Sequence, residues 1–312
     1  MKKILSALTL GAGILFAQSQ ENLKPSLTNL NTTTLNKTAT PLVIHNGEVS
    51  VLTSLQKPNL ILYFKNGNST SEGRKIEWLK HPTQKGFFAV LAQPYRATHS
   101  LVITDQDGRK QPFEVAFVKK QYPSEAIKVA PNKLQYPPQT AKRIAAEYKE
   151  AMEIYSNSVQ DTLFQTPFQK PLNSKITSHY GNARTYNGQL KSFHGGTDFR
   201  APIGTNITAS NSGVVRLAKQ RFLSGGSVLI DHGGGIFTKY FHLSEIFVTP
   251  GQFVEKGELL AKSGNTGRSS GPHLHFGVAL NGVDVNPLDF IEKINAIFEP
   301  QLVQALDINQ VK

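Results

Sequence analysis

Six of the nine histidines lie between residues 160 and 290. In one segment His194 and Asp198 are four residues apart and enclose Gly195 and Gly196. A helix would place the histidine and the aspartate on one face, but two adjacent glycines disfavour a helix. A bend between a loop and a strand, which glycines permit, could bring both side chains to one point. This spacing alone is weak evidence, because a histidine and an aspartate can each simply face solvent.

A second segment carries two histidines at strand spacing. Leu274, Phe276 and Val278 alternate with His273 and His275, which predicts a β-strand. Residues two apart on a strand point to the same side, so both imidazoles face one way while the apolar side chains enter the core. Two histidines on one face of an otherwise apolar strand are costly without partners. A metal site would supply such partners.

A third segment, 226–242, is predicted to form a β-hairpin with a glycine turn. His242 shares one face of its second strand with Thr238 and Tyr240, which can place it beside the other histidines. His232 falls at the turn and is interpreted as a turn or surface residue.

The chain has no cysteine, so any metal must be held by histidines and carboxylates. Catalytic zinc sites keep three protein ligands and leave the fourth position to water. Two histidines and one carboxylate meet that count. Zinc lowers the pKa of bound water to about 7 and polarises a carbonyl, while a base takes the proton and a donor stabilises the oxyanion. One further histidine of the paired motif, and His242, are available for these tasks.

Five motifs, in this order and spacing, carry a resemblance to a known family. From about residue 170 to residue 292 the chain resembles the lysostaphin/LytM-type zinc endopeptidases of bacterial cell walls. The matching motifs are residues 176–181, 194–199, 240–244, 263–267 and 271–276.

The resemblance implies a role for each site residue. His194, Asp198 and His275 would bind one Zn²⁺ ion. His273 would be the catalytic base or proton shuttle, and His242 would orient water or stabilise the oxyanion.

The same resemblance implies a substrate groove with walls formed by residues 178–181 and by the loop 264–271. Arg184 lies one residue later than the family's groove arginine, so no role is assigned to it. Tyr186 is the nearest candidate for the tyrosine that precedes the first ligand in the family.

The predicted organisation surrounds these motifs with non-catalytic segments. Lys2 and Lys3 followed by the apolar run 4–16 predict a cleaved signal peptide, because the run is too short to span a bilayer comfortably. An uncleaved membrane anchor is the alternative. The predicted segments are a signal peptide (1–17), a flexible lead-in (18–40), an N-terminal β domain with a candidate regulatory role (41–120), a linker with a helix (121–160), the catalytic zinc peptidase domain (161–295) and a tail (296–312).

Between residues 42 and 120, short apolar runs separated by turn signals predict a small, sandwich-like β domain. The residues 105–108 predict a hairpin that joins the last two strands. His45, His81 and His99 are isolated and are interpreted as surface residues. The predicted strands are 49–52, 60–64, 86–91, 101–104 and 113–118.

Two helices are predicted. Four prolines mark 121–139 as a linker, and helical spacing begins at about Thr140, a plausible N-cap of a connector without chemistry. At the other end Asn286 would cap a helix, with Pro287 at its first position and Asp289 at the positive end of its dipole.

Because strand patterns outnumber these helices, the predicted fold class is mainly β. The resemblance makes the C-terminal domain an antiparallel β barrel-sandwich (a duplicated hybrid motif, as in LytM-like domains), joined by a helical linker to the small N-terminal β domain.

The net charge and the predicted export limit the class of partner. The net charge is +12, and an exported basic protein suits an anionic wall polymer. No Lys/Arg stripe with interleaved aromatics is present, which disfavours nucleic acid, and no segment after residue 17 is apolar enough to span a membrane.

The resemblance implies an exported, periplasmic zinc endopeptidase that hydrolyses peptide cross-links of peptidoglycan, of D,D type, in cell-wall remodelling and cell shape. The alternative is a regulatory or scaffolding partner of another wall hydrolase, acting with a paralogous wall protein. In that alternative the N-terminal half could cover the groove and supply a fourth zinc ligand.

Overall fold

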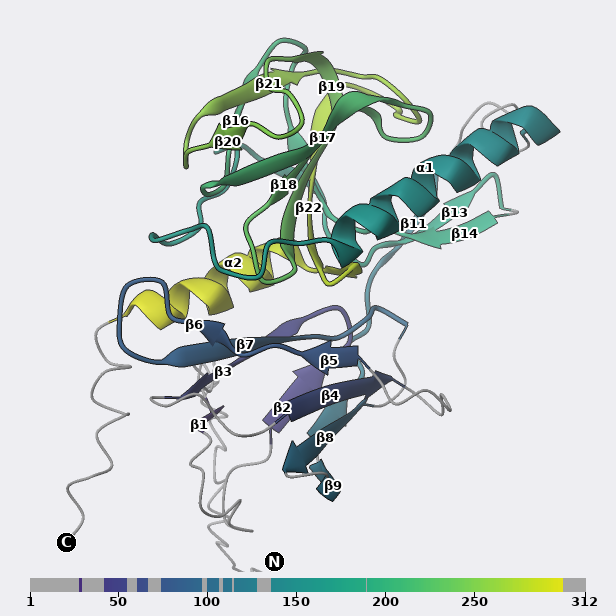
Figure 1. Cartoon of the computed structure of the whole chain (residues 1–312). Coiled ribbons are helices and arrows are strands. Elements are labelled where there is room, and N and C mark those ends of the chain that lie inside the picture. The colour runs from purple at the N-terminus through teal and green to yellow at the C-terminus, as the bar shows by residue number, and fades with distance from the viewer. Residues whose placement is uncertain are drawn as a thin grey trace, which may run out of the picture.

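The computed structural model describes residues 28–29, 42–54, 61–66, 74–96, 100–106, 109–113, 115–127, 136–188 and 190–299. The predicted signal peptide, His99 and most of the predicted tail lie outside these residues. Within them, Figure 1 shows a C-terminal β structure above an N-terminal β part, with a helix between the two. None of the described helices is long and apolar enough to cross a membrane.

The C-terminal part is built on one large antiparallel sheet, in the order β12-β15-β22-β19-β18-β17-β20. Its two end strands do not pair with each other, so the expected barrel is not closed, while the mainly β class is confirmed. The bounds are β12 Ile176–Ser178, β15 Thr197–Arg200, β16 Asn206–Thr208, β17 Gly213–Arg221, β18 Gly225–Asp231, β19 Ile236–Ile246, β20 Phe253–Val254, β21 Leu259–Ser263, β22 His273–Leu280 and β23 Val283–Val285.

Strand alternation gives this sheet one core face and one open face. On β22 the side chains of Leu274, Phe276 and Val278 are fully buried, as the sequence predicts. On β19 the fully buried Tyr240 pairs with Phe276, and Phe241 pairs with His275. The predicted hairpin is confirmed by the pairing of β18 with β19. Its turn runs through three glycines that all have positive φ, where a side chain would strain the backbone.

The N-terminal β part contains two four-stranded sheets, β1-β3-β7-β6 and β5-β4-β8-β9, and the parallel pair β10-β2. The hairpin predicted at 105–108 is confirmed, because β8 pairs with β9 in antiparallel orientation. Its second strand is 109–113 instead of the predicted 113–118. β10 instead pairs in parallel with β2. The bounds are β1 Thr28–Asn29, β2 Leu42–His45, β3 Val49–Ser54, β4 Ile61–Asn66, β5 Arg74–Ile76, β6 Leu79–Lys80, β7 Phe87–Ala92, β8 Ser100–Gln106, β9 Arg109–Phe113 and β10 Val115–Val118.

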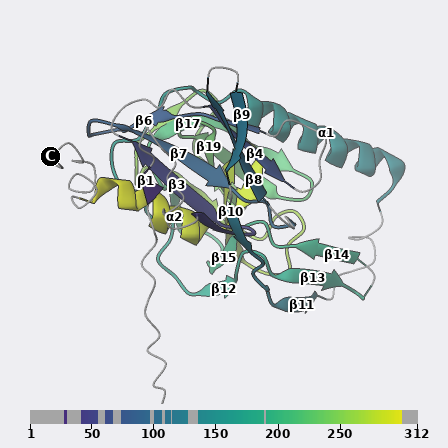
Figure 2. The same ribbon diagram turned by 90° about the horizontal axis from the view of Figure 1, so that it is seen from below.

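The predicted linker contains both a strand and a helix. β11 (Ser124–Ile127) pairs in parallel with β13 (Ala183–Tyr186), which pairs with β14 (Leu190–Phe193). Figure 2 shows these three strands together at one side of the molecule. The linker therefore adds a strand to the hairpin that leads into His194.

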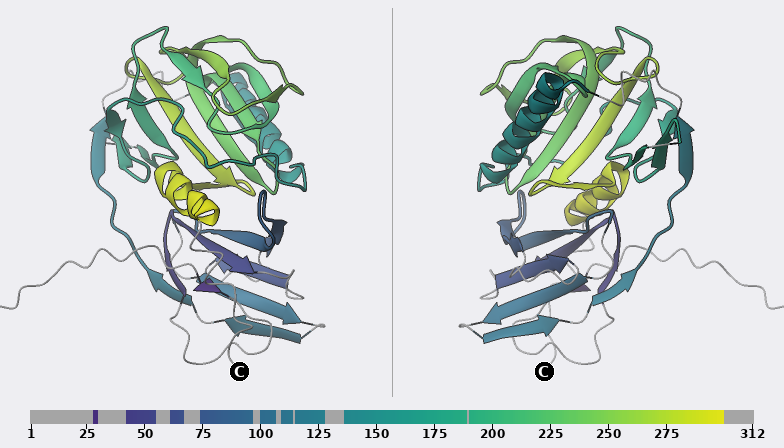
Figure 3. Two further views of the ribbon diagram at one scale, coloured as in Figure 1. Left: turned by 90° about the vertical axis from the view of Figure 1, so that its left-hand side faces the viewer. Right: turned by 90° about the vertical axis from the view of Figure 1, so that its right-hand side faces the viewer.

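Helix α1 (Pro138–Ser156) is the helix expected from about Thr140, but Thr140 is not its N-cap. The cap is Pro137 and makes no side-chain hydrogen bond. Pro138 occupies the first helical position, where its fixed φ suits the helix and its missing N–H costs nothing. In the right-hand view of Figure 3, α1 lies across the open face of the C-terminal sheet.

Helix α2 (Pro287–Asn295) connects the two β parts. Asn286 caps it as predicted, since its side-chain oxygen accepts from the backbone N–H groups of Leu288 and Asp289. The Asp289 carboxylate also accepts from the N–H of Val49 on β3, at 2.9 Å. Residues 296–298 of the predicted tail continue α2 as a short 3₁₀ helix, Ala296–Phe298.

The surface interpretation of His81 is wrong. Its side chain is buried, and Nδ1 accepts from the N–H groups of Thr83 and Gln84. Nε2 therefore donates to the carbonyl of Ile297, 2.9 Å away. This histidine links the N-terminal part to the end of the C-terminal helix. His45 is partly exposed and lies 3.2 Å from Glu48.

Candidate metal centre

Three side chains from separate positions in the chain converge at the end of the large sheet. Asp198 on β15 lies directly opposite His275 on β22. Asp198 Oδ1 lies 2.8 Å from Nε2 of His194 and 2.9 Å from Nδ1 of His275. The two imidazole nitrogens are 3.0 Å apart. All three candidate ligand atoms fall within 4.8 Å of one another, so one ion could contact all of them.

The glycines between His194 and Asp198 form the bend that the sequence predicts. A Cβ at Gly196 would lie 2.4 Å from the carbonyl oxygen of Phe276 and 2.7 Å from Nε2 of His275. At Gly195 it would lie 2.9 Å from the Asp284 carboxylate. The backbone approaches β22 closely enough to bring His194 and Asp198 together only because neither residue has a side chain.

Neighbouring groups fix the orientation of the two candidate histidine ligands. Nδ1 of His194 donates to the carbonyl of His179, 2.9 Å away, which leaves Nε2 unprotonated and turned toward Asp198. The ring of His275 stacks on Phe241, with centroids 5.4 Å apart and planes within 3°. Burial lowers the pKa of His275 to about 4, although the neighbouring Asp198 carboxylate opposes this shift. A neutral imidazole is the form that binds metal.

The Asp198 carboxylate is held in its charged form. Burial alone would raise its pKa, but the neighbouring imidazoles of His194 and His275 outweigh burial and hold the pKa well below its usual range. Arg184 Nη2 donates to the second carboxylate oxygen at 2.9 Å. Arg184, which the sequence left without a role, therefore orients a candidate ligand. The β13-β14 hairpin carries it there, a placement that sequence spacing did not reveal.

His273 and His242 flank the three candidate ligands. Nε2 of His273 lies 3.7 Å from Asp198 Oδ1, and the rings of His273 and His242 are 4.7 Å apart. Each histidine donates from Nδ1 to a backbone carbonyl: His273 to Gly271 at 2.7 Å and His242 to Thr266 at 2.8 Å. In the neutral tautomer of each ring the proton is therefore on Nδ1.

His242 reaches this position through an irregularity in β19. Its φ is +63°, in the left-handed region, and the pairing registers of β19 shift next to it. Burial, followed by the charges of His275 and His273, lowers the pKa of His242 to about 3. The imidazole is therefore neutral at physiological pH.

The donor set fits zinc of the catalytic kind. Two imidazole nitrogens and one carboxylate oxygen supply three ligands. Among the histidines, aspartates and glutamates that the structure describes, no fourth joins this group. The N-terminal β part and α1 thus contribute no such ligand from their described residues.

Residues 192–287 match peptidase family M23. The chain carries a peptidase M23 domain. A crystal structure of a putative peptidase M23 from Pseudomonas aeruginosa is similar over 81% of this chain and 96% of that one, with 26% identity and a TM-score of 0.60. This likeness includes the part upstream of the M23 domain.

Curated relatives match the M23 domain and its surroundings. The peptidoglycan DD-endopeptidase ShyA of Vibrio cholerae is 41% identical over 40% of this chain and 30% of its own length. The DD-carboxypeptidase/endopeptidase Mpg of Neisseria meningitidis is 40% identical over 36% of this chain and 25% of its own. The chain therefore spans less than a third of the length of these two relatives.

The other residues expected from the family resemblance take different places. Tyr180, predicted for a groove wall, is buried and donates to the carbonyl of Asp284 at 2.9 Å. His179 of the same motif is exposed. In the loop 264–271, the carbonyls of Thr266 and Gly271 orient the two flanking histidines. Tyr186 lies on β13, but its side chain is outside the described part.

The surface interpretation of His232 is wrong. The residue is fully buried at the end of β18 and packs edge-on against Phe168. Nδ1 donates to the carbonyl of Ser212 and Nε2 lies 2.8 Å from the hydroxyl of Thr238. The glycine turn folds back on the protein instead of projecting into solvent: a Cβ at Gly233 would collide with the carbonyl of Asp161.

Proposed function

We propose that this chain is a zinc-dependent endopeptidase that hydrolyses peptide cross-links of peptidoglycan, as a D,D-endopeptidase of cell-wall remodelling and cell shape. One observation carries the proposal: the M23 domain brings three zinc-type donors together with two flanking histidines, each held at Nδ1 by a backbone carbonyl. The names of relatives such as ShyA and Mpg support the substrate class.

His194, Asp198 and His275 would hold the zinc ion in this proposal. Zinc supplies a bound water acidic enough to ionise near neutral pH and an acceptor for the scissile carbonyl. His273 takes the proton from the water, because the Gly271 carbonyl engages its Nδ1 and its Nε2 lies next to the three ligands. His242 accepts a hydrogen bond from the same water and orients it. A neutral His242 with its proton on Nδ1 cannot donate to an oxyanion, so water orientation is the better of its two expected roles.

We also propose that the chain acts outside the cytoplasm, in the periplasm, after removal of the signal segment 1–17. A cell-wall substrate and a net charge of +12 support this location.

The test is muropeptide analysis. Purified chain without the predicted signal segment is incubated with peptidoglycan, and cross-linked muropeptide dimers are quantified with and without chelator. Loss of dimers is expected for the zinc-loaded chain alone. His194→Ala should be inactive because a ligand is missing. His273→Ala should keep zinc yet lose about 10²–10⁴-fold in rate, the usual contribution of a general base.

His45→Ala is the matched control, since this partly exposed histidine lies in the N-terminal β part, and its rate should stay within about twofold of the unmodified chain. Dimer loss that survives both substitutions in the centre would refute the proposed site. No cleavage by the zinc-loaded chain would favour the regulatory alternative, in which it acts with another wall protein.

A further inference from the structure

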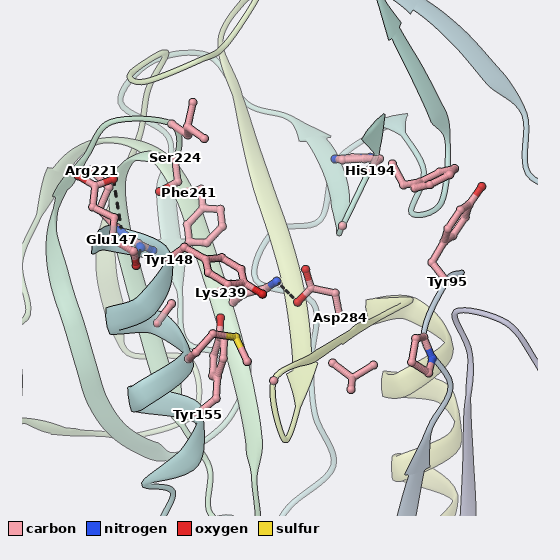
Figure 4. A pocket seen from close by; sticks show the side chains of 18 of the residues that line it. Tyr95, Glu147, Tyr148, Tyr155, His194, Arg221, Ser224, Lys239, Phe241 and Asp284 are labelled. Atoms are coloured by element: carbon pink, nitrogen blue, oxygen red, sulfur yellow. Dashed lines mark hydrogen bonds and ion pairs between the residues drawn. The ribbon is translucent and has the colours of Figure 1, made fainter. Parts of the chain in front are cut away.

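A cavity of about 800 Å³ begins at the metal centre and runs along the open face of the sheet. Its volume is within the range of pockets that hold small ligands, about 300–1,000 Å³. His194 and Gly195 line one end, and Lys239 and Phe241 of β19 line the floor. Figure 4 shows α1 on one side of this floor and Tyr95 on the other, with His194 between them and near Tyr95.

Two of the cavity walls come from outside the residues that match the family. One is the face of α1 that carries Tyr148, Met152 and Tyr155, and the other is the pair Tyr95 and Arg96, which follows β7. Both segments lie upstream of residue 192, where the M23 match begins. The cavity is therefore a feature of the whole chain.

The α1 wall is held firmly against the sheet. The Glu147 carboxylate accepts from the N–H of Phe222 at 2.9 Å, and Glu150 pairs with Lys219 at 2.5 Å. Tyr155 packs edge-on against Phe237, with centroids 5.1 Å apart. Tyr148 is free of such packing and leaves 67% of its surface exposed beside the cavity. An exposed aromatic ring on a fixed helix can contact a ligand without reorganisation.

The opposite wall is tied to the metal-binding loop. The Tyr95 ring lies 3.8 Å from the ring of Phe193, the residue directly before His194. The Arg96 guanidinium lies over the same Phe193 ring at 4.9 Å. The carbonyl of Tyr95 accepts from the Asn46 side chain, which anchors this segment to the β2–β3 turn. The N-terminal β part thus places a cation over the residue that directly precedes His194.

The floor supplies no free charge to compete with that cation. Lys239 is buried and pairs with Asp284, Nζ to Oδ1 2.6 Å. Burial opposes the lysine charge, but the Asp284 carboxylate outweighs it and raises the pKa of Lys239. At the α1 end, Arg221 Nε lies 4.0 Å from a Glu147 oxygen. Among the described residues, Arg96 is the wall cation that contacts an aromatic ring and has no carboxylate partner.

We propose that this cavity is the subsite for one stem peptide of the cross-linked substrate, with a free carboxylate of that peptide bound by Arg96 and its backbone packed against Tyr148. Arginine binds carboxylates through charge-assisted hydrogen bonds, and aromatic walls suit a short peptide. Tyr95, Arg96 and Tyr148 are therefore specificity-determining residues supplied from outside the M23 match. This inference rests on the proposed function, because it takes its ligand from that substrate class.

The experiment measures binding and turnover separately. Purified cross-linked muropeptide dimer is titrated calorimetrically into the zinc-loaded chain carrying His273→Ala, with and without Arg96→Glu. Arg96→Glu should raise Kd about tenfold or more, since a charge-assisted contact becomes a repulsion. In the chain with His273 intact, KM should rise by a similar factor while kcat stays within about twofold. Arg96→Lys should recover part of the affinity.

Lys85→Glu is the matched control: it makes the same charge change at an exposed position of the same β part and should leave Kd and KM unchanged. Tyr148→Ala changes an exposed side chain, so folding is not at risk, and it should raise KM several-fold. Dimer with its carboxylates amidated should bind the unmodified chain and Arg96→Glu equally.

Equal Kd for Arg96→Glu and Lys85→Glu would overturn the inference. Arg96-dependent binding without any cleavage by the zinc-loaded chain would leave the subsite standing and refute the proposed function. Cleavage that is unchanged by substitution of Arg96 and Tyr148 would support the proposed function and refute the subsite.

Discussion

The C-terminal domain contains two groups of buried histidines, and the two groups differ in what their ring nitrogens contact. His232 has both ring nitrogens engaged by the protein, with Nδ1 on Ser212 and Nε2 beside Thr238. His194 has one nitrogen engaged by a backbone carbonyl, and the other points at Asp198 and His275. Burial is nearly complete for both histidines. A nitrogen left facing other donors, and not burial itself, distinguishes the candidate metal centre from the core.

The same strands build both environments, because β19 sends alternate side chains to the two faces of the sheet. Thr238, beside His232, and Tyr240 face the core, while Phe241 faces His275 and Lys239 lies in the floor of the cavity. The core face carries aromatic rings and hydroxyl groups that form hydrogen bonds with one another. The other face keeps polar groups with nitrogen or oxygen atoms that can bind an ion or a substrate.

Loss of a ligand should give the largest difference between the two groups. His275→Ala should lose its zinc, from about one ion per chain to none after dialysis, because two ligands hold zinc far less tightly than three. Hydrolysis of peptidoglycan should disappear with the metal. His232→Gln should keep about one zinc per chain. Elemental analysis of the dialysed proteins checks both values, and a full zinc content in His275→Ala would contradict the assignment.

Acid should destabilise the core group through His232. Burial lowers the pKa of His232 to about 4, whereas an unfolded histidine titrates near 6.5. The unfolded chain therefore binds the extra proton first as the pH falls, and this contribution to stability is lost between about pH 6.5 and 4. The loss amounts to roughly 3 kcal/mol at about 1.4 kcal/mol per pKa unit.

The measurement is urea unfolding of the chelator-treated chain across that pH range, beside His232→Gln. The other buried histidines titrate in both proteins, so their contributions cancel in the difference. The unmodified chain should lose about 3 kcal/mol more than the variant. Parallel pH profiles would show that His232 is not a buried neutral histidine.

A smaller effect should come from Arg184, which supports a ligand without contacting the ion. Arg184→Ala frees one oxygen of Asp198 and should weaken zinc binding by about 10–100-fold, as for other groups behind a ligand. Arg184→Lys should restore part of the affinity. Arg216→Ala, whose side chain contacts the carbonyl of Asn157, is the control. Competition with a chromogenic chelator measures the affinities, and an Arg184→Ala value equal to the control would remove Arg184 from the centre.

The sequence predicted the centre better than its surroundings. Strand alternation placed His273 and His275 on one face, and the Gly195–Gly196 bend brought His194 to Asp198, because both effects depend on local geometry. The same reasoning failed for His232. A glycine turn normally lies at the surface, and nothing in the local sequence shows that residues 158–163 cover it.

Contacts between distant segments were not predictable from spacing. Arg184 reaches Asp198 because β13 joins β14 and β11, and a pairing with the proline-rich linker gives no periodic signal. His81 is buried by the chain end after α2, more than two hundred residues away. The walls of the cavity likewise meet only in the folded chain, since Tyr95 and Tyr148 belong to separate segments.

The most direct test of the central claim is diffraction from crystals of the zinc-loaded full chain, collected on both sides of the zinc absorption edge. One anomalous peak is expected at about 2.0–2.2 Å from His194 Nε2, a carboxylate oxygen of Asp198 and His275 Nδ1, with water as the fourth ligand. A peak elsewhere, or a fourth ligand supplied by a side chain of the N-terminal half, would contradict an open catalytic centre.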